Sequence, residues 1–100
     1  MAQIPDSFTL FGQQWQIRTA EPYELPEDLG QCRTDQHEII ISANQCPETL
    51  IHVIMHELVH CIEVKLHLEL TERQVDLVAL GFIDLFRNNP NMLSLLERQL

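Results

Sequence analysis

Three residues with metal chemistry stand close together near the middle of the chain, in the order His56-Glu57-Leu58-Val59-His60. The surrounding run from Thr49 to Val64 contains no Pro or Gly, and its apolar residues recur at intervals of three and four. This periodicity predicts a helix. Residues four apart on a helix share one face, with their Cβ atoms about 5–6 Å apart. His56 and His60 are therefore predicted to bind one metal ion together.

Glu57 follows His56 directly, so it borders the predicted metal site without being forced to bind the ion. A general base that takes a proton from a metal-bound water must stand in this position. Apolar neighbours favour a metal site, because burying unpaired imidazoles among them would be unfavourable. One alternative stays open, in which the motif arises by chance and the chain is a metal-free helical interaction module.

A catalytic zinc ion usually has three protein ligands and keeps its fourth position for water. We expect Glu72 to be the third ligand, because it begins a helix that a short connection turns back against the first. Asp76 lies one helical turn further on and is predicted to hydrogen-bond a ligand histidine. Four other downstream residues remain alternatives for the third ligand: Glu63, His67, Glu69 and Asp76 itself.

The elements that must position these residues can be predicted from residue patterns. A hairpin is expected over residues 7–19, with Gly12-Gln13 in its turn, and an acidic surface loop over 20–29. Two further strands are expected over 30–34 and 38–42. Helices are expected over 47–66, from Thr71 to about 89, and over 92–100. Thr71 and Gln74 have the capping-box spacing that starts a helix. The expected fold class is α+β, with a small antiparallel sheet of three to four strands followed by an active-site helix, a second packed helix and a short C-terminal helix.

Composition restricts the class of protein. A chain of 100 residues predicts one domain, 1–100. The net charge of −9 argues against nucleic acid or an anionic membrane surface as a partner. No apolar run has the length of a membrane span, and no signal peptide is visible at the N-terminus. Three cysteines without a framework spacing predict a reduced, cytoplasmic protein with ordinary thiols.

The motif at 56–60, followed by Glu72-Arg73-Gln74-Val75-Asp76, resembles the gluzincins. In these zinc peptidases two motif histidines and a glutamate from a following E-x-x-x-D helix hold the zinc. The order of the expected elements is similar to that of the smallest members, the minigluzincins, and of small phage-type metallopeptidases related to the ImmA/IrrE group. The resemblance covers residues 8 to about 90. It implies a minimal zincin-like domain in which strand 38–42 or its neighbour receives a peptide as an added strand.

These observations lead to one expected function and one rival. The expected function is a zinc-dependent metalloendopeptidase that acts on a peptide or protein substrate, with His56, His60 and Glu72 holding Zn²⁺ and Glu57 as the general base. The rival is a zinc-stabilised binding or regulatory protein with little or no peptidase activity. If the enzyme were latent, the segment 91–100 would be expected to lie over the cleft.

Overall fold

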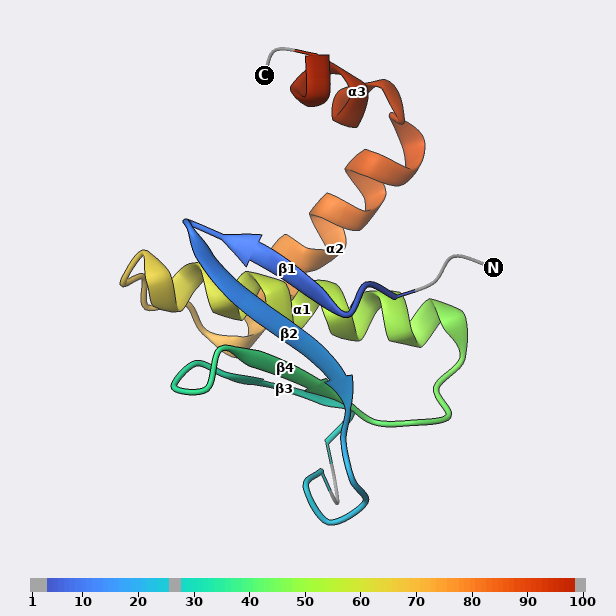
Figure 1. The fold of residues 1–100 in the computed structure, drawn as a ribbon. Helices are drawn as coiled ribbons and strands as arrows, with labels where there is room; N and C mark the ends of the chain where they lie inside the picture. The colour runs from blue at the N-terminus through green and yellow to red at the C-terminus, as the bar shows by residue number, and fades with distance from the viewer. Residues whose placement is uncertain (1–3, 26–27, 99–100) are drawn as a thin grey trace.

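The computed structural model describes residues 4–25 and 28–98 and shows an α+β fold, in which four strands precede three helices (Figure 1). The strands are β1 (Ser7–Leu10), β2 (Gln13–Thr19), β3 (Gly30–Arg33) and β4 (Glu38–Ile41), and the helices are α1 (Pro47–Lys65), α2 (Glu72–Asn88) and α3 (Asn91–Arg98). The predicted order of sheet, motif helix, second helix and short last helix is confirmed. Parts of the predicted acidic loop (26–27) and of the predicted last helix (99–100), as well as residues 1–3, lie outside the described residues.

The sheet is mixed, so the prediction of a wholly antiparallel sheet is wrong. Its strand order is β1-β2-β4-β3, and β2 pairs with β4 in parallel. The three isoleucines of β4, Ile39 to Ile41, are almost completely buried, whereas β3 has only one apolar residue, Cys32. An apolar strand favours the interior of a sheet, where both of its faces can be covered. Strand β4 therefore lies between β2 and β3, and β3 forms the edge.

The first hairpin has the predicted strands but a turn that is shifted by one residue. Phe11 and Gly12, rather than Gly12-Gln13, form the turn, and Leu10 pairs with Gln13. Both turn residues have positive φ, 48° and 78°. Two successive residues of this kind suit a tight two-residue hairpin, whose twist matches that of the strands.

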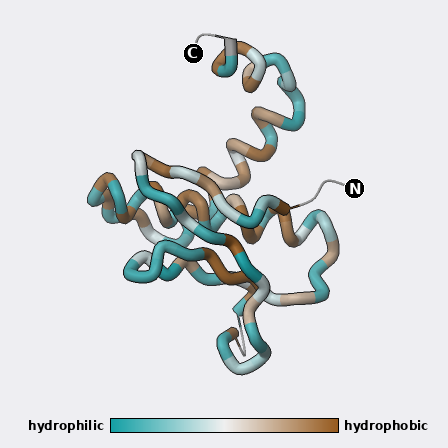
Figure 2. Tube along the Cα trace, viewed as in Figure 1, coloured by the Kyte–Doolittle hydropathy of each residue, from teal (hydrophilic) through white to brown (hydrophobic). Residues whose placement is uncertain are grey.

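The core lies between the sheet and α1, and a smaller apolar cluster joins α1 to α2. The hydropathy colouring in Figure 2 shows a hydrophobic stretch in the middle of the sheet, where β4 runs. The buried residues of the main cluster are Trp15, Ile17, Ile39, Ile41 and Cys61. The smaller cluster consists of Val59, Val75 and Ala79. Helix α1 is therefore fixed from both sides, which gives the histidine motif a rigid support.

The described part of the C-terminal segment does not cover the motif. Helix α3 follows the far end of α2, away from the middle of α1 (Figure 1). Its residues 91–97 are all exposed. The arrangement suggested for a latent enzyme is therefore not the one that the structure adopts.

Gly30 lets the edge strand approach the motif helix closely. A Cβ atom added at Gly30 would lie 2.5 Å from Val53 Cγ1 and 3.4 Å from Glu57 Cγ. Val53 is β-branched and has little rotamer freedom on a helix. A side chain at position 30 would therefore push β3 away from α1.

We expect Gly30→Ala to destabilise the protein by about 1–3 kcal/mol, the usual penalty for overpacking a well-packed contact. Urea unfolding followed by far-UV circular dichroism measures the change. Because the clash is with Val53, the double variant Gly30→Ala/Val53→Ala should have less than the sum of the two single losses. Strict additivity of the two losses would contradict the proposed contact.

Candidate metal centre

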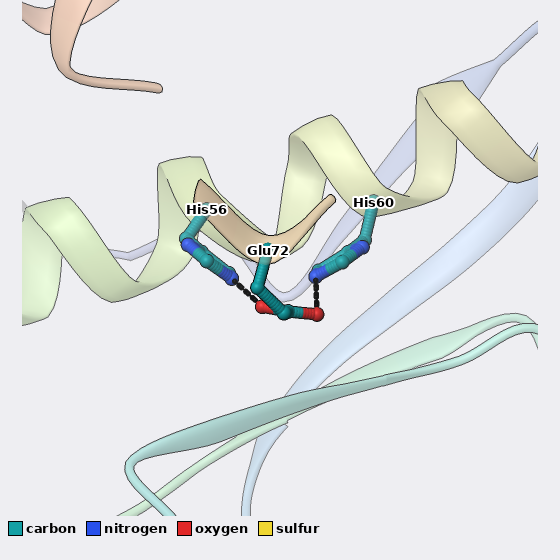
Figure 3. Close-up of side chains that lie close together, drawn as sticks. All are labelled: His56, His60 and Glu72. Carbon is teal, nitrogen blue, oxygen red and sulfur yellow. Dashed lines mark hydrogen bonds and ion pairs between the residues drawn. The ribbon is translucent and has the colours of Figure 1, made fainter. Parts of the chain in front are cut away.

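Helix α1 directs His56 and His60 to one side, and Glu72 of α2 lies between them (Figure 3). The Nε2 atom of His56 is 3.1 Å from Glu72 Oε2, and the Nε2 atom of His60 is 3.0 Å from Glu72 Oε1. One ligand atom from each of the three residues lies within 4.8 Å of the others. The structure thus brings the three predicted ligands together in an arrangement that could hold a metal ion.

The turn after α1 sets the path of the chain toward Glu72. His67 has a positive φ of 56°, Leu68 N–H donates to Glu63 O (2.8 Å) and His67 N–H donates to Val64 O (3.2 Å). This pair of bonds is the Schellman arrangement that ends many helices. His67 therefore serves the turn and, like Glu69, is exposed. Neither belongs to the group of ligand atoms, although both had been alternatives for the third ligand.

The start of α2 places Glu72 in its first turn. The Thr71 hydroxyl accepts a hydrogen bond from Gln74 N–H (3.1 Å), and Thr71 N–H donates to Gln74 Oε1 (2.9 Å). The predicted capping box is therefore confirmed. Because these bonds fix the first turn of α2, they also fix the backbone that carries Glu72.

Glu63, another alternative ligand, instead supports His60. Its Oε1 atom lies 2.7 Å from His60 Nδ1, and its Oε2 atom accepts a hydrogen bond from Leu70 N–H (2.9 Å). The Leu70 amide, which outweighs the opposing effect of burial, lowers the pKa of Glu63. Glu63 therefore stays ionised and orients the His60 ring. The i, i+3 spacing from His60 is the signal in the sequence for this contact, because residues three apart are neighbours on the surface of a helix.

Asp76 lies beside His56, as predicted. Its Oδ1 atom is 3.3 Å from His56 Nδ1 and also 3.0 Å from His52 Nε2. A carboxylate on the second ring nitrogen fixes the tautomer and the orientation of a metal-binding histidine. His52 lies one turn before His56 on α1, and the two rings share the same Asp76 oxygen.

The donor set offers a physical test of whether a cation fits. Each motif histidine has a carboxylate oxygen near both of its ring nitrogens. A neutral imidazole has only one N–H, so it can donate to only one of the two carboxylates. The other nitrogen then faces a carboxylate oxygen with its lone pair, which is unfavourable without a positive charge between them. A cation bound by the two Nε2 atoms and Glu72 satisfies all of these groups, while Glu63 and Asp76 accept the Nδ1 protons.

Protonation of the histidines would satisfy the same contacts in part. Although burial opposes it, hydrogen bonds to Glu63 and Glu72 raise the pKa of His60 above its usual value. A metal ion and these protons would compete for the same Nε2 atom. The surrounding carboxylates thus favour a positive charge at the Nε2 atoms, whether a metal ion or a proton supplies it.

Glu57 is buried beside this group, with 7% of its surface exposed. Burial raises the pKa of its carboxyl group, while the neighbouring His56 and His60 act in the opposite direction. Glu57 lines two adjoining clefts of about 450 Å³ each, one with His60 and Glu72 and the other with His56 and Asp76. Gly30 lines both clefts, so the edge strand β3 forms their opposite wall.

We expect Glu63→Gln to weaken zinc binding by roughly 10–100-fold, the usual effect of losing a partner of a metal-binding histidine. The amide of Gln can still accept a hydrogen bond from His60 Nδ1. It lacks the negative charge by which Glu63 strengthens the binding of a cation at His60 Nε2. Competition with a chromophoric chelator measures the affinity. Glu69→Gln is the matched control, because Glu69 is exposed and lies outside the ligand group. Equal zinc affinities in the two variants would contradict this role of Glu63.

Comparisons of the chain with protein-family models, with curated proteins and with solved structures find no match. Among the described residues, no helix has both the length and the apolar character that a membrane crossing requires.

Proposed function

We propose that the protein is a zinc-dependent metallopeptidase. The observation that supports this most directly is the convergence of His56, His60 and Glu72 on one point, beside the buried carboxyl group of Glu57 and an open cleft. Two imidazoles and one carboxylate are a ligand set that suits zinc and leaves a coordination position for water. A purely structural zinc site would instead have a fourth protein ligand.

Zinc, when bound, would activate a water molecule and polarise the carbonyl group of the peptide bond. The protein's own residues would supply the proton transfers. Glu57 would accept a proton from the attacking water and deliver it to the leaving amine. Its raised pKa suits this role, because a base with a pKa closer to neutral can both accept and return a proton.

The substrate would bind along β3. Strand β4, one of the strands suggested from the sequence, has neighbours on both sides and cannot accept another strand. Its neighbour β3 pairs only with β4 among the described strands, and it borders the clefts at Glu57. An extended peptide could therefore pair with the free edge of β3 and bring its backbone past the metal site.

We propose a peptide or protein as the substrate and the cytoplasm as the location. The three cysteines are all free thiols, which is usual in a reducing compartment. The net charge of −9 is unfavourable for contact with nucleic acid or anionic lipid.

The proposal is tested by incubating the protein with a library of internally quenched peptides in three states: as purified, stripped by a chelator, and reloaded with one equivalent of Zn²⁺. We expect cleavage that disappears on stripping and returns on reloading. If the protein binds one zinc but cleaves no peptide, the peptidase proposal fails. The zinc-stabilised binding protein would then be the better interpretation.

A further inference from the structure

Two thiols meet between the edge strand and the motif helix. The Sγ atoms of Cys32 on β3 and Cys61 on α1 are 2.9 Å apart, although the residues are 29 positions apart in the chain. Cys61 is completely buried. Cys32 is half-buried and lines the cleft that also contains Glu57 and His60. A small reagent in this cleft can therefore reach one thiol of the pair directly.

The positions of the two sulfur atoms are close to those of a covalent bond. A disulfide has an S–S length of about 2.05 Å, so the two atoms need to approach by only about 0.9 Å. Strand β3 already packs tightly on α1 at Gly30, two residues before Cys32. We propose that Cys32 and Cys61 are a reversible oxidation site, in which hydrogen peroxide or another small peroxide converts the two thiols into a disulfide that links β3 to α1 beside the metal centre.

The reaction balances with one peroxide molecule. With hydrogen peroxide, the Cys32 sulfur attacks one peroxide oxygen, the O–O bond breaks, and the departing hydroxide takes up the thiol proton and leaves as one water, giving a sulfenic acid. The Cys61 sulfur then attacks the Cys32 sulfur, the S–O bond breaks, and a second water leaves with the second thiol proton. The two thiols lose two electrons in total, and the peroxide gains them.

Cys46 provides an internal comparison. It is exposed, and the pKa of its thiol is lowered, chiefly by a hydrogen bond with the Thr49 hydroxyl at 3.1 Å. A more acidic, exposed thiol reacts faster with small reagents. However, the Cys46 sulfur contacts the Thr49 hydroxyl, whereas the sulfur atoms of the other two cysteines contact each other. Selective linkage of Cys32 to Cys61 would therefore reflect proximity and not the reactivity of an isolated thiol.

The test uses the zinc-loaded, reduced Cys46→Ser protein, so that only the two thiols of the pair remain. After treatment with a small excess of hydrogen peroxide, we expect the titratable thiols under denaturing conditions to fall from two to none. Peptide mass spectrometry should show the fragments containing Cys32 and Cys61 joined within one chain, with the mass of two hydrogen atoms lost. Dithiothreitol should restore both thiols.

The linkage should also stabilise the fold, because it closes a long loop in the unfolded chain. We expect the midpoint of thermal unfolding to rise by roughly 10 °C relative to the reduced protein. Cys32→Ser/Cys46→Ser is the matched control, and its unfolding midpoint should not change on the same treatment.

Three results would overturn the proposal: both thiols surviving the peroxide, Cys32 oxidising to a sulfinic acid without a link to Cys61, or links forming only between chains. The result does not depend on peptidase activity. Failure of the peptidase proposal and failure of this proposal are therefore separate outcomes.

Discussion

Zinc affinity is expected to fall by well over 100-fold when Glu72 is replaced by Ala, more than the roughly 10–100-fold typical for loss of a supporting residue. Among the residues that the structure describes, Glu72 is the one whose carboxylate lies between the two Nε2 atoms, at 3.0 and 3.1 Å. Without it, two imidazoles remain, which are too few to hold zinc tightly. Elemental analysis of protein purified without added metal should give about one zinc per wild-type chain and much less for the variant.

The variant should remain folded, which makes the loss of zinc interpretable. The side chain of Glu72 is 76% exposed, and the capping bonds that start α2 come from Thr71 and Gln74. Glu69→Ala is the control, since it removes an exposed acid from the connection just before α2. Full zinc affinity in Glu72→Ala would contradict the ligand assignment. Loss of zinc in both variants would indicate that the negative charge of the protein attracts zinc nonspecifically, without a defined set of ligands.

Local patterns in the sequence predicted the elements that carry the site. The recurrence of apolar residues around His56 and His60 predicted α1, and the spacing of Thr71 and Gln74 predicted the start of α2. These features depend on neighbours in the chain, through helix periodicity and backbone capping. Because both local predictions were correct, the position of Glu72 beside the motif could also be predicted.

Properties that depend on distant contacts could not be predicted in the same way. The parallel pairing of β2 with β4 joins two strands that are separated in the chain by a loop and by β3, so no local pattern expresses it. The contact between Cys32 and Cys61 likewise joins a strand and a helix whose two cysteines are 29 positions apart in the chain. Residue type alone therefore gave no sign that two of the cysteines are neighbours.

The different roles of two acidic residues near the motif also depend on contacts that local patterns do not predict. Glu63 and Glu72 are both acids downstream of His60, and either could be imagined as the third ligand. Glu63 is directed to the Nδ1 atom because the Schellman turn brings the Leu70 amide to its other oxygen. This turn contains His67 in a conformation that glycine normally adopts, so the sequence gave little indication of it.

Replacing Glu57 by Gln is expected to leave zinc binding unchanged and to lower peptide hydrolysis by roughly 10²–10⁴-fold, the range attributed to a positioned acid or base. The amide has nearly the same shape as the carboxyl group but cannot accept a proton. Glu57 is outside the group of ligand atoms, so the three zinc ligands are unaffected. Zinc analysis and cleavage of the best peptide from the library measure the two properties on the same preparation.

The stability of the same variant distinguishes a catalytic base at position 57 from a residue that only supports the fold. Burial raises the pKa of Glu57 in the folded protein above its value in the unfolded chain. The ionised form is therefore disfavoured by folding, and stability falls as pH rises from the unfolded pKa through the folded one. Gln carries no charge, so metal-free Glu57→Gln should be at least as stable as the metal-free wild type at pH 7 and should lose this pH dependence. Urea unfolding at pH 5 and pH 7 measures the pH dependence of stability.

A variant that hydrolyses peptides as fast as wild type would exclude Glu57 as the base, and one that loses both zinc and stability would assign it a structural role.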